Sequence, residues 1–432
     1  MGVLSKLTGA VALTTMLASD VKAQAAGTCS GVTGRFEPKL GEGYTYSVLA
    51  TGLTSPRHIV IDSEGNLLVA EAGTQSVTRL VLEDQEDIVC VASSNEVASG
   101  STNHGIALSG DGKTLFTSNL ASVTAYTYDA TTGSVDAGTQ IVKGMSFQGT
   151  HPTRAIATSQ WSPDTILVAR GSGANVDNTT VDQAAARSII KTFSISEGLQ
   201  AAHDYAEGGE VLAWGLRNIV GLTEDPVFGG IWSVENQMDD IHLNGVDIHT
   251  NNPAERLSYH GILNATDNPQ KGRNFGYPSC VPAWDPSSIT SLPNLSVGDL
   301  FHPDDVPDPS DIGACDDTTA RATGRLHFPA HTAPLDVKFT ADGTAAYIAF
   351  HGSWDRSPAD GYRVMRVDFN AEDGQPVEAA DSTTAQVPVL ENGDVGDCPN
   401  NCFRPVGLAF DAKGRLFVSS DTSGEIYVIY GA

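Results

Sequence analysis

Positive charge is scarce in this sequence. Its 432 residues include 25 lysines and arginines against 52 aspartates and glutamates, and the formal net charge is −27. Such an excess of acid disfavours binding to nucleic acid or to an anionic membrane surface, and it suits a secreted protein that stays soluble through self-repulsion. It also makes any cluster of arginines notable.

Long hydrophobic runs are missing beyond the N-terminus, so no later stretch is expected to span a bilayer. Within residues 1–25, Lys6 precedes the apolar run Leu7–Ala18, and small residues follow at cleavage spacing, which predicts a secretory signal peptide. We therefore expect residues 26–432 to form a single, free, extracellular domain. Three N-glycosylation acceptors agree with secretion: Asn178-Thr-Thr, Asn264-Ala-Thr and Asn294-Leu-Ser.

The six cysteines include no CxxC pair, which disfavours a zinc site. In an oxidising compartment, an even number of cysteines indicates pairing. The short spacing of Cys398 and Cys402 predicts a local disulfide. The remaining expected pairs are Cys280 with Cys315 and Cys29 with Cys90, although a sequence alone does not fix connectivity.

Two common enzyme motifs are also absent. No GxGxxG follows a strand and opens a helix, which disfavours a nicotinamide or flavin bound on a Rossmann fold. No GxSxG elbow is present for a serine hydrolase. Amphipathic helices of any length are absent as well, so the fold is expected to consist of strands.

One strand pattern recurs along the chain: an apolar strand, a Gly/Asp turn, a second apolar strand, a polar loop and a third strand rich in β-branched residues. Repetition at this period is typical of radial or solenoid architectures. The six copies cover 59–81, 105–127, 155–193, 214–234, 335–367 and 406–430.

Strand pairs joined by tight turns and repeated six times predict an all-β, six-bladed β-propeller. The last copy supplies three strands before the chain ends, and we expect Tyr44–Ala50 to provide the fourth and so close the ring. The alternative architecture is a large β-sandwich, which fits six copies of one motif poorly.

A long insertion, about 246–325, separates the fourth and fifth copies and is rich in Pro, Asn, Asp and Ser. A long irregular connection in a compact domain is usually functional. We interpret it as a disulfide-stapled lid or wall over one end of the propeller. The alternative is a decorated surface loop with no role in the site.

In a propeller, the segment just before each innermost strand lines the mouth of the central channel. Every copy offers an arginine or a histidine there. The six segments are Ser55-Pro-Arg57-His58, Asn103-His104, His151-Pro-Thr-Arg154, Arg217-Asn218, His331-Thr-Ala-Pro334 and Phe403-Arg404-Pro405.

For Arg217 and Asn218 alone, which lie on a Gly-flanked loop, the commoner role is an arginine that ties two loops through carbonyls. Six equivalent positions converging on one channel favour a binding site, because a ring of cations repels itself unless an anion lies among them. The expected ligand is strongly anionic, such as a small polycarboxylate or a phosphate. The oxygen-rich segment Val234–Asp240 suits Ca²⁺ better than zinc, and a turn capped by Asp side chains explains it equally well.

Five motifs span nearly all the expected mature chain: Gly215-Leu-Arg-Asn-Ile-Val-Gly-Leu222, Gly272-Arg-Asn-Phe-Gly-Tyr-Pro278, Ala330-His-Thr-Ala-Pro-Leu335, Phe350-His-Gly-Ser-Trp-Asp-Arg356 with Gly361-Tyr362, and Arg404-Pro-Val-Gly-Leu408 with Ser420-Asp-Thr-Ser-Gly424. These motifs resemble those of the soluble quinoprotein sugar dehydrogenases, in particular the sorbosone dehydrogenase-like group and the fungal pyranose dehydrogenases of auxiliary activity family 12. One departure is Asp355, which stands where much of the family has asparagine.

The resemblance implies a six-bladed propeller that holds pyrroloquinoline quinone (PQQ), a tricarboxylate ortho-quinone, with one Ca²⁺ at the channel mouth. His151 resembles the general base that takes the proton of the anomeric hydroxyl while hydride passes from C1 to the quinone. Arg217 resembles the arginine beside the reactive carbonyl. Further candidates on the cofactor are Arg57, His104, Asn218, His331, His351, Trp354, Arg356 and Arg404. The carbonyls of Gln237 and Met238 resemble the calcium ligands, with Asp240 beside them.

The implied partners are a sugar substrate and an external electron acceptor, such as a cytochrome or a secreted copper oxidase. Two other functions stay open at this point. A calcium-dependent propeller lactonase or phosphoesterase needs Asp, Glu and Asn side chains that converge on a metal, whereas these mouths offer Arg and His. A non-catalytic carbohydrate-binding propeller would leave the histidines structural.

Overall fold

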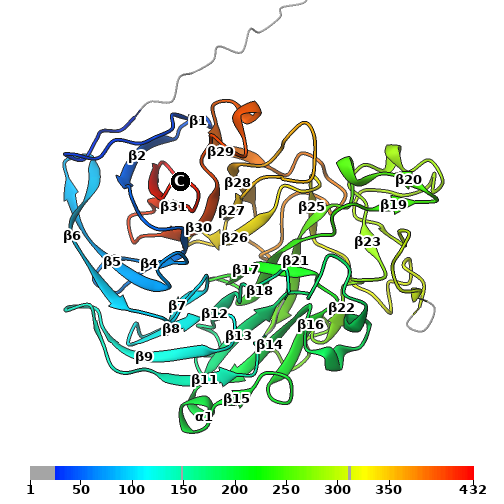
Figure 1. The fold of residues 1–432 in the computed structure, drawn as a ribbon, viewed down its shortest axis with the longest axis horizontal. Helices are drawn as coiled ribbons and strands as arrows, with labels where there is room; N and C mark the ends of the chain where they lie inside the picture. Colours follow the sequence, from blue (N-terminus) through cyan, green and yellow to red (C-terminus); the bar gives the residue numbers. More distant parts are fainter. Residues whose placement is uncertain (1–24, 147–148, 310–312) are drawn as a thin grey trace, which may run out of the picture.

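The computed structural model describes residues 25–146, 149–309 and 313–432. Its strands form six antiparallel blades set radially around a central channel (Figure 1). The innermost strands contact one another in turn and close a ring; they are β3 (Pro56–Ile61), β7 (Ile106–Leu108), β12 (Ile156–Thr158), β17 (Asn218–Glu224), β26 (Pro334–Phe339) and β30 (Pro405–Phe410). The predicted six-bladed propeller is confirmed.

The outer strands follow in chain order within most blades. Blade 1 adds β4 (Leu67–Glu71), β5 (Ser76–Gln85) and β6 (Ile88–Ala98), and blade 2 adds β8 (Thr114–Ser118), β9 (Val123–Asp129) and β11 (Thr139–Lys143). Blade 3 adds β13 (Thr165–Arg170), β14 (Ile189–Ser194) and β16 (Glu210–Trp214), and blade 4 adds β18 (Gly230–Asn236), β21 (Glu255–Ile262) and β25 (Leu326–Phe328). Blade 5 adds β27 (Ala345–Phe350), β28 (Arg363–Asp368) and β29 (Val387–Asn392), and blade 6 adds β31 (Leu416–Ser420) and β32 (Glu425–Tyr430).

Short elements extend these blades at their edges. They are β1 (Pro38–Leu40) on β29, β10 (Ser134–Val135) on β9, β15 (His203–Asp204) on β11 and β22 (Arg273–Asn274) on β16. Among the described residues there is one α-helix, α1 (Ile195–Gln200), whose first turn is capped by the Ser194 side chain accepting the Glu197 N–H. The 3₁₀ turns that lie wholly within the described residues are Asn178–Val181, Gln183–Ala185, His249–Asn251, Pro286–Ser288 and Val395–Asp397.

Tight turns explain why the repeat folds as hairpins. In blade 1, Asp62 accepts the N–H groups of Glu64 and Asn66, and Gly65 has a φ of +81°, which disfavours any residue with a Cβ. Blade 6 repeats the arrangement, with Gly414 at a φ of +76°. The local sequence therefore fixes the register of each first hairpin.

Ring closure follows the expected route. Strand β2 (Thr45–Ala50) pairs with β32, so that the N-terminal segment supplies the fourth strand of blade 6. Leu49 of β2 is fully buried and packs with Ile59 and Ile426. This arrangement covers the edge that the end of the chain leaves open.

The core consists of six apolar clusters, each lying between two consecutive blades. For example, Leu68 and Ala70 of blade 1 pack with Leu115 and Tyr126 of blade 2. Each blade thus buries both faces against its neighbours, and this accounts for the near-continuous apolar strands in the sequence.

The long insertion lies within blade 4 and not after it, which corrects its predicted bounds. Strand β21 is the third strand of blade 4 and β25 is its fourth, so the long connection is 263–325. The connection contributes β23 (Val281–Pro282) and β24 (Leu300–Phe301), while the hairpin β19 (His242–Leu243) and β20 (Val246–Asp247) precedes β21. Together these elements form a separate apolar cluster at one edge of the propeller (Figure 1).

The three predicted disulfides are confirmed: Cys29–Cys90, Cys280–Cys315 and Cys398–Cys402. No helix among the described residues is long and apolar enough to cross a membrane. The predicted signal peptide lies outside the described residues apart from Ala25. The side chains of the three glycosylation acceptors are exposed.

Candidate active site

A cavity of about 460 Å³ lies at the channel end where the innermost strands β17, β26 and β30 begin. The mouth segments of blades 3 to 6 line it, as the sequence predicts, because each side chain stands just before an innermost strand. The predicted site residues that line this cavity are His151, Arg217, Asn218, Gln237, Asp240, His331, His351, Trp354 and Arg404.

His151 has a defined tautomer. Its Nδ1 lies 3.0 Å from the carbonyl oxygen of Ser172 and 3.0 Å from the Ser172 hydroxyl. A carbonyl can only accept, so Nδ1 carries the proton and Nε2 keeps its lone pair. Burial, and after it the charge of Arg217, lowers the pKa of His151 to about 4. The imidazole is therefore neutral near pH 7 and able to accept a proton at Nε2.

Arg217 ties two loops together. Its Nε donates to the Asn175 carbonyl at 3.1 Å, and Nη2 donates to Asn175 Oδ1 at 2.9 Å and to Asp239 Oδ2 at 2.7 Å. Its Nη1 donates to the Gln237 carbonyl at 2.5 Å and to the Asn236 carbonyl at 3.5 Å. All five N–H donors therefore have protein acceptors, and the last of these bonds is the longest.

Asn218 has an acceptor atom without a partner. Its Oδ1 is buried and makes no hydrogen bond among the described residues. The neighbouring Gly171 keeps this space open, since a Cβ there would lie 2.5 Å from Asn218 Oδ1 and 3.0 Å from His151 Cβ. A ligand that offers a donor or a cation to Asn218 would satisfy the oxygen.

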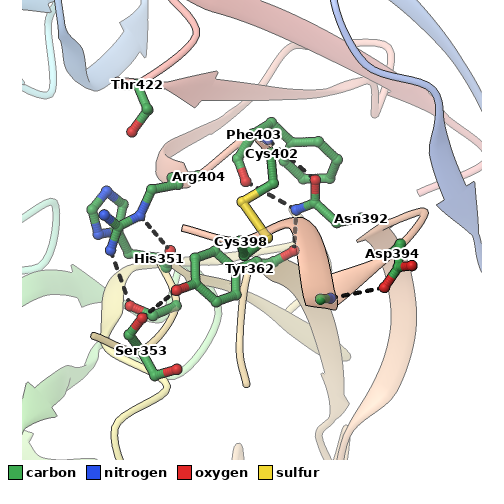
Figure 2. Close-up of a disulfide and its surroundings, with 12 residues drawn as sticks. His351, Ser353, Tyr362, Asn392, Asp394, Cys398, Cys402, Phe403, Arg404 and Thr422 are labelled. Atoms are coloured by element: carbon green, nitrogen blue, oxygen red, sulfur yellow. Dashed lines mark hydrogen bonds between the residues drawn. A yellow bond between two sulfur atoms is a disulfide. The ribbon is translucent and has the colours of Figure 1, made fainter. Parts of the chain in front are cut away.

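Arg404 is held from behind by a disulfide-braced loop (Figure 2). Its Nε donates to the His351 carbonyl and its Nη2 to the Gly352 carbonyl, each at 3.1 Å. The preceding Phe403 exchanges hydrogen bonds with Asn392, and Cys402 links this turn to Cys398. The Tyr362 ring lies 5.5 Å below the guanidinium and its hydroxyl donates to the Ser353 carbonyl. We call the disulfide-braced turn 398–402 the clip. Together with these hydrogen bonds it fixes where Arg404 meets the cavity.

Arg57 and His104 lie behind the cavity wall and do not line it. Arg57 pairs with Asp421 at 2.6 Å, and its Nε donates to Nδ1 of His104 at 3.1 Å. His104 is fully buried, and its Nε2 donates to the Val220 carbonyl at 3.2 Å. Burial, followed by the charges of His58 and Arg57, holds the pKa of His104 well below its ordinary value.

The predicted ring of six repelling cations is therefore wrong in part. Two of its arginines already form ion pairs with protein carboxylates, Arg57 with Asp421 and Arg217 with Asp239. Arg154 is fully buried and donates to the carbonyls of Met145, His151 and Thr153, which is the loop-tie role.

Two further predicted site residues lie outside the cavity lining. Arg356 donates to the carbonyls of Ala330 and Pro358, each at 3.2 Å, and so braces its own loop. The Met238 side chain is fully buried in the apolar cluster of the insertion, whereas the predicted calcium ligand is its carbonyl, which stays a prediction. Neither side chain is placed to touch a ligand in this cavity.

The sequence reasoning missed four polar residues at the site. Asp421 accepts from both Arg57 and His351 Nε2, the latter at 2.9 Å. Asn175 accepts the Asp239 N–H and donates to the Asp239 carbonyl. Glu255 is buried, accepts the Gln237 N–H at 2.7 Å, and has its pKa raised to about 7, mainly by burial. Asp421 stands in the quoted Ser420–Gly424 motif and Asp239 in the oxygen-rich segment Val234–Asp240, whereas Asn175 and Glu255 carry no sequence signal.

The model of the family described as TrAA12-like matches residues 38–432. The chain is 42% identical over 399 residues to the pyrroloquinoline quinone-dependent sugar dehydrogenase of Hypocrea jecorina, and the match covers 91% of this chain and 89% of that protein.

Two solved structures share the fold over nearly the whole chain. The calcium structure of the Trichoderma reesei family AA12 enzyme has a TM-score of 0.87 at 41% identity, covering 94% of this chain and 100% of the other. The holo form of the pyranose dehydrogenase PQQ domain from Coprinopsis cinerea has a TM-score of 0.86 at 35% identity, covering 93% and 99%. The resemblance predicted from the motifs is confirmed: the chain belongs to the TrAA12-like family.

Proposed function

We propose that this protein is a secreted, PQQ-dependent dehydrogenase that oxidises the anomeric C1 hydroxyl of a pyranose or ketoaldose. The family and its sugar-oxidising relatives support the reaction class. The observation that carries the mechanism is the tautomer of His151, whose Nδ1 proton is held by Ser172 while Nε2, at the cavity wall, has no hydrogen-bond partner among the described residues.

The lining suits a tricarboxylate quinone. Arg404 and Arg217 supply positive charge, and the buried Asn218 Oδ1 lacks a partner. We assign Arg404, Asn218, His351 and Trp354 to cofactor binding. Arg57, His104 and Arg356 support the wall from behind in this assignment. When bound, the quinone supplies the hydride acceptor for the C1 hydrogen.

The chain's own residues would handle the proton. His151 Nε2 accepts the proton of the C1 hydroxyl as the C1 hydrogen leaves with its electron pair, so a pyranose becomes a lactone. Arg217, held by five hydrogen bonds, keeps positive charge beside the reacting atoms without having to reorganise. An external electron acceptor must then reoxidise the protein.

A divalent cation completes the proposal. One related structure is described as a calcium structure. The cavity wall of this chain contains carboxylates, and the buried Gln237 Oε1 has no partner among the described residues. These oxygens are the donors that Ca²⁺ prefers.

The test is reconstitution of the purified protein with PQQ and Ca²⁺, followed by absorbance changes on adding aldoses and ketoaldoses. We expect quinone reduction by at least one sugar, and we expect His151→Ala to keep bound quinone but to lose about 10²- to 10⁴-fold in turnover. His302→Ala, at an exposed histidine of the insertion, is the control. Near-wild-type turnover in His151→Ala would rule out the base assignment.

One observation favours the hydrolase alternative, since Asp239 lines the cavity and one oxygen each of Asp239 and Asp355 lie within 4.8 Å of each other. Lactone and phosphoester hydrolysis should therefore be assayed on the same samples. Metal-dependent hydrolysis without any quinone reduction would replace the dehydrogenase proposal.

A further inference from the structure

A tryptophan and an N-glycosylation acceptor meet where blades 3 and 4 adjoin. Trp161 lies in the loop between β12 and β13 of blade 3, and Asn264 follows β21 of blade 4. The side-chain Nδ2 of Asn264 donates to the Trp161 carbonyl at 2.8 Å. Because a carbonyl can only accept, the nitrogen of the amide, and not its oxygen, faces this loop. The atom that would carry a sugar is therefore placed beside Trp161.

One face of the Trp161 indole lies against Gly229. A Cβ on Gly229 would lie 2.6 Å from Cδ2 of the indole, 2.7 Å from Cγ and 3.0 Å from Cε2. Cδ2 is a ring-fusion carbon, and ring bonds take up all three of its in-plane directions. An atom this close to Cδ2 therefore lies above or below the ring. Gly229, with a φ of +71° and no side chain, leaves the space that this face of the indole needs.

The opposite face of the indole is presented to solvent. Trp161 is 43% exposed although Gly229 covers one face, so its exposed surface lies on the other face and the rim. The loop is also held in place, because the N–H groups of Gln160 and Trp161 both donate to Glu224 Oε2, at 2.6 Å and 3.3 Å. A pyranose ring presents C–H groups on one side, and a flat, fixed indole is a surface on which such a side packs.

The acceptor itself has the required chemistry. Asn264-Ala-Thr266 is an acceptor sequence, and Asn264 and Thr266 are both exposed. The Asn264 amide has two N–H groups, and the bond to Trp161 uses one of them. In glycosylation Nδ2 loses one proton and bonds to C1 of the sugar, while the C1–O bond to the diphosphate of a lipid-linked oligosaccharide breaks and the diphosphate leaves with the electron pair. The remaining N–H keeps a donor for the Trp161 carbonyl.

We propose that Asn264 carries an N-linked glycan and that its first sugar packs on the open face of Trp161. The acceptor sequence and the position of the indole are independent observations that lead to the same place. The inference goes beyond the proposed function and rests on it only in that the chain enters a secretory pathway. Because the sugar would cover apolar surface, the glycan would stabilise the junction of blades 3 and 4.

The test compares the protein secreted from a fungal host with two variants of the acceptor. Thr266→Ala removes the acceptor but keeps Asn264 and its bond to Trp161, whereas Thr266→Ser preserves the acceptor. Peptide mass spectrometry measures how much of Asn264 is modified. Hydroxyl-radical footprinting measures the oxidation rate of Trp161, with Trp354, which is 69% exposed at the cofactor cavity, as the internal reference.

We expect Asn264 to be modified in the wild type and in Thr266→Ser. Trp161 should oxidise at least about twofold faster in Thr266→Ala, because its open face is then uncovered. The rate of Trp354 should be the same in all three proteins. Thr266→Ala should also lower Tm by about 1–2 °C, which is the size expected for exposing one indole face in a chain of this length.

Two controls locate the contact at the first sugar of this glycan. Trimming by an endoglycosidase that leaves the first sugar should keep Trp161 protected. Asn294→Gln, at an acceptor that lines a different cavity, should leave the oxidation rate of Trp161 unchanged. Unmodified Asn264 in the secreted protein, or equal oxidation of Trp161 in the wild type and Thr266→Ala, would overturn the proposal. Neither measurement involves the quinone or sugar oxidation, so its failure is distinguishable from failure of the proposed reaction.

Discussion

Replacing Asp421 by asparagine tests how the cavity wall is supported. Asp421 lies between Arg57, at 2.6 Å, and His351 Nε2, at 2.9 Å, and the side chains of Asp421 and Arg57 are only 16% and 14% exposed. Asparagine keeps the shape but removes the charge. Arg57 then loses its carboxylate in a poorly solvated position, where its guanidinium keeps a hydrogen bond to His104.

We expect Asp421→Asn to lower the unfolding free energy by about 2–3 kcal/mol, because it removes charge-assisted hydrogen bonds from the mostly buried Arg57–Asp421 pair. For a chain of this size, an unfolding entropy of about 2.1 cal/mol/K per residue converts this loss into a fall in Tm of about 2–4 °C. Thermal unfolding of the apoprotein measures it, with Asp381→Asn as the exposed control.

The pH dependence has a defined sign. Burial alone raises the pKa of Asp421, but the charges and hydrogen bonds of His351 and Arg57 outweigh burial, and the net pKa lies well below its ordinary value. A carboxylate with a depressed pKa stabilises the fold above its unfolded pKa of about 4, and this contribution is lost as the pH falls further. The Tm difference should therefore be constant from pH 7 to 5 and shrink below about pH 4. Equal Tm values at pH 7, or a difference that grows in acid, would refute the reasoning.

Two further predictions concern the proposed reaction and the clip. Because the pKa of His151 is lowered to about 4, the neutral base is present above that pH and is protonated below it. We therefore expect kcat/KM to fall only as the pH drops toward about 4. A fall centred near pH 6.5 in the pH–rate profile would contradict the buried environment of His151 beside Arg217. The double substitution of Cys398 and Cys402 by serine should weaken PQQ binding, measured by quenching of tryptophan fluorescence, because Arg404 follows the braced turn. In the matched control, the double substitution of Cys29 and Cys90 removes a disulfide whose cysteines do not line the cavity, and it should lower Tm and leave PQQ affinity unchanged. Equal PQQ affinity in both double variants would show that the clip does not support the cofactor site.

Most of the fold was predictable because each blade repeats its own turn chemistry, and Asp62 with Gly65 or Asp411 with Gly414 specifies a hairpin without distant contacts. Strand β21 was missed because its apolar residues alternate with polar ones that would ordinarily face solvent. It contains Arg256, Ser258 and His260, all buried. Arg256 pairs with Glu235 of β18, and His260 lies 2.8 Å from the Ser233 hydroxyl. These partners exist only once the sheet has formed, and the polar composition therefore indicated a loop.

The same limit applies to the site. Repeat position correctly brought four mouths to one cavity, but it could not reveal which cations already have counter-ions. Asp421 lies more than 360 residues from Arg57 in the chain, and Asp239 reaches Arg217 through a loop. The sequence identifies the arginine of such an ion pair, but it does not indicate which aspartate lies close to that arginine in the folded protein.

Arg217 shows why a loop tie and a site residue need not be alternatives. Its hydrogen bonds to Asn175 and to 236–239 make it a tie by any structural criterion. The same bonds hold its charge at the cavity wall and fix Asp239, whose other oxygen faces His331. A rigid arginine cannot offer a free N–H to a ligand, but it can supply a field that needs no rearrangement. We therefore expect Arg217 to act through its fixed charge at the cavity wall and through the position in which it holds the Asp239 carboxylate.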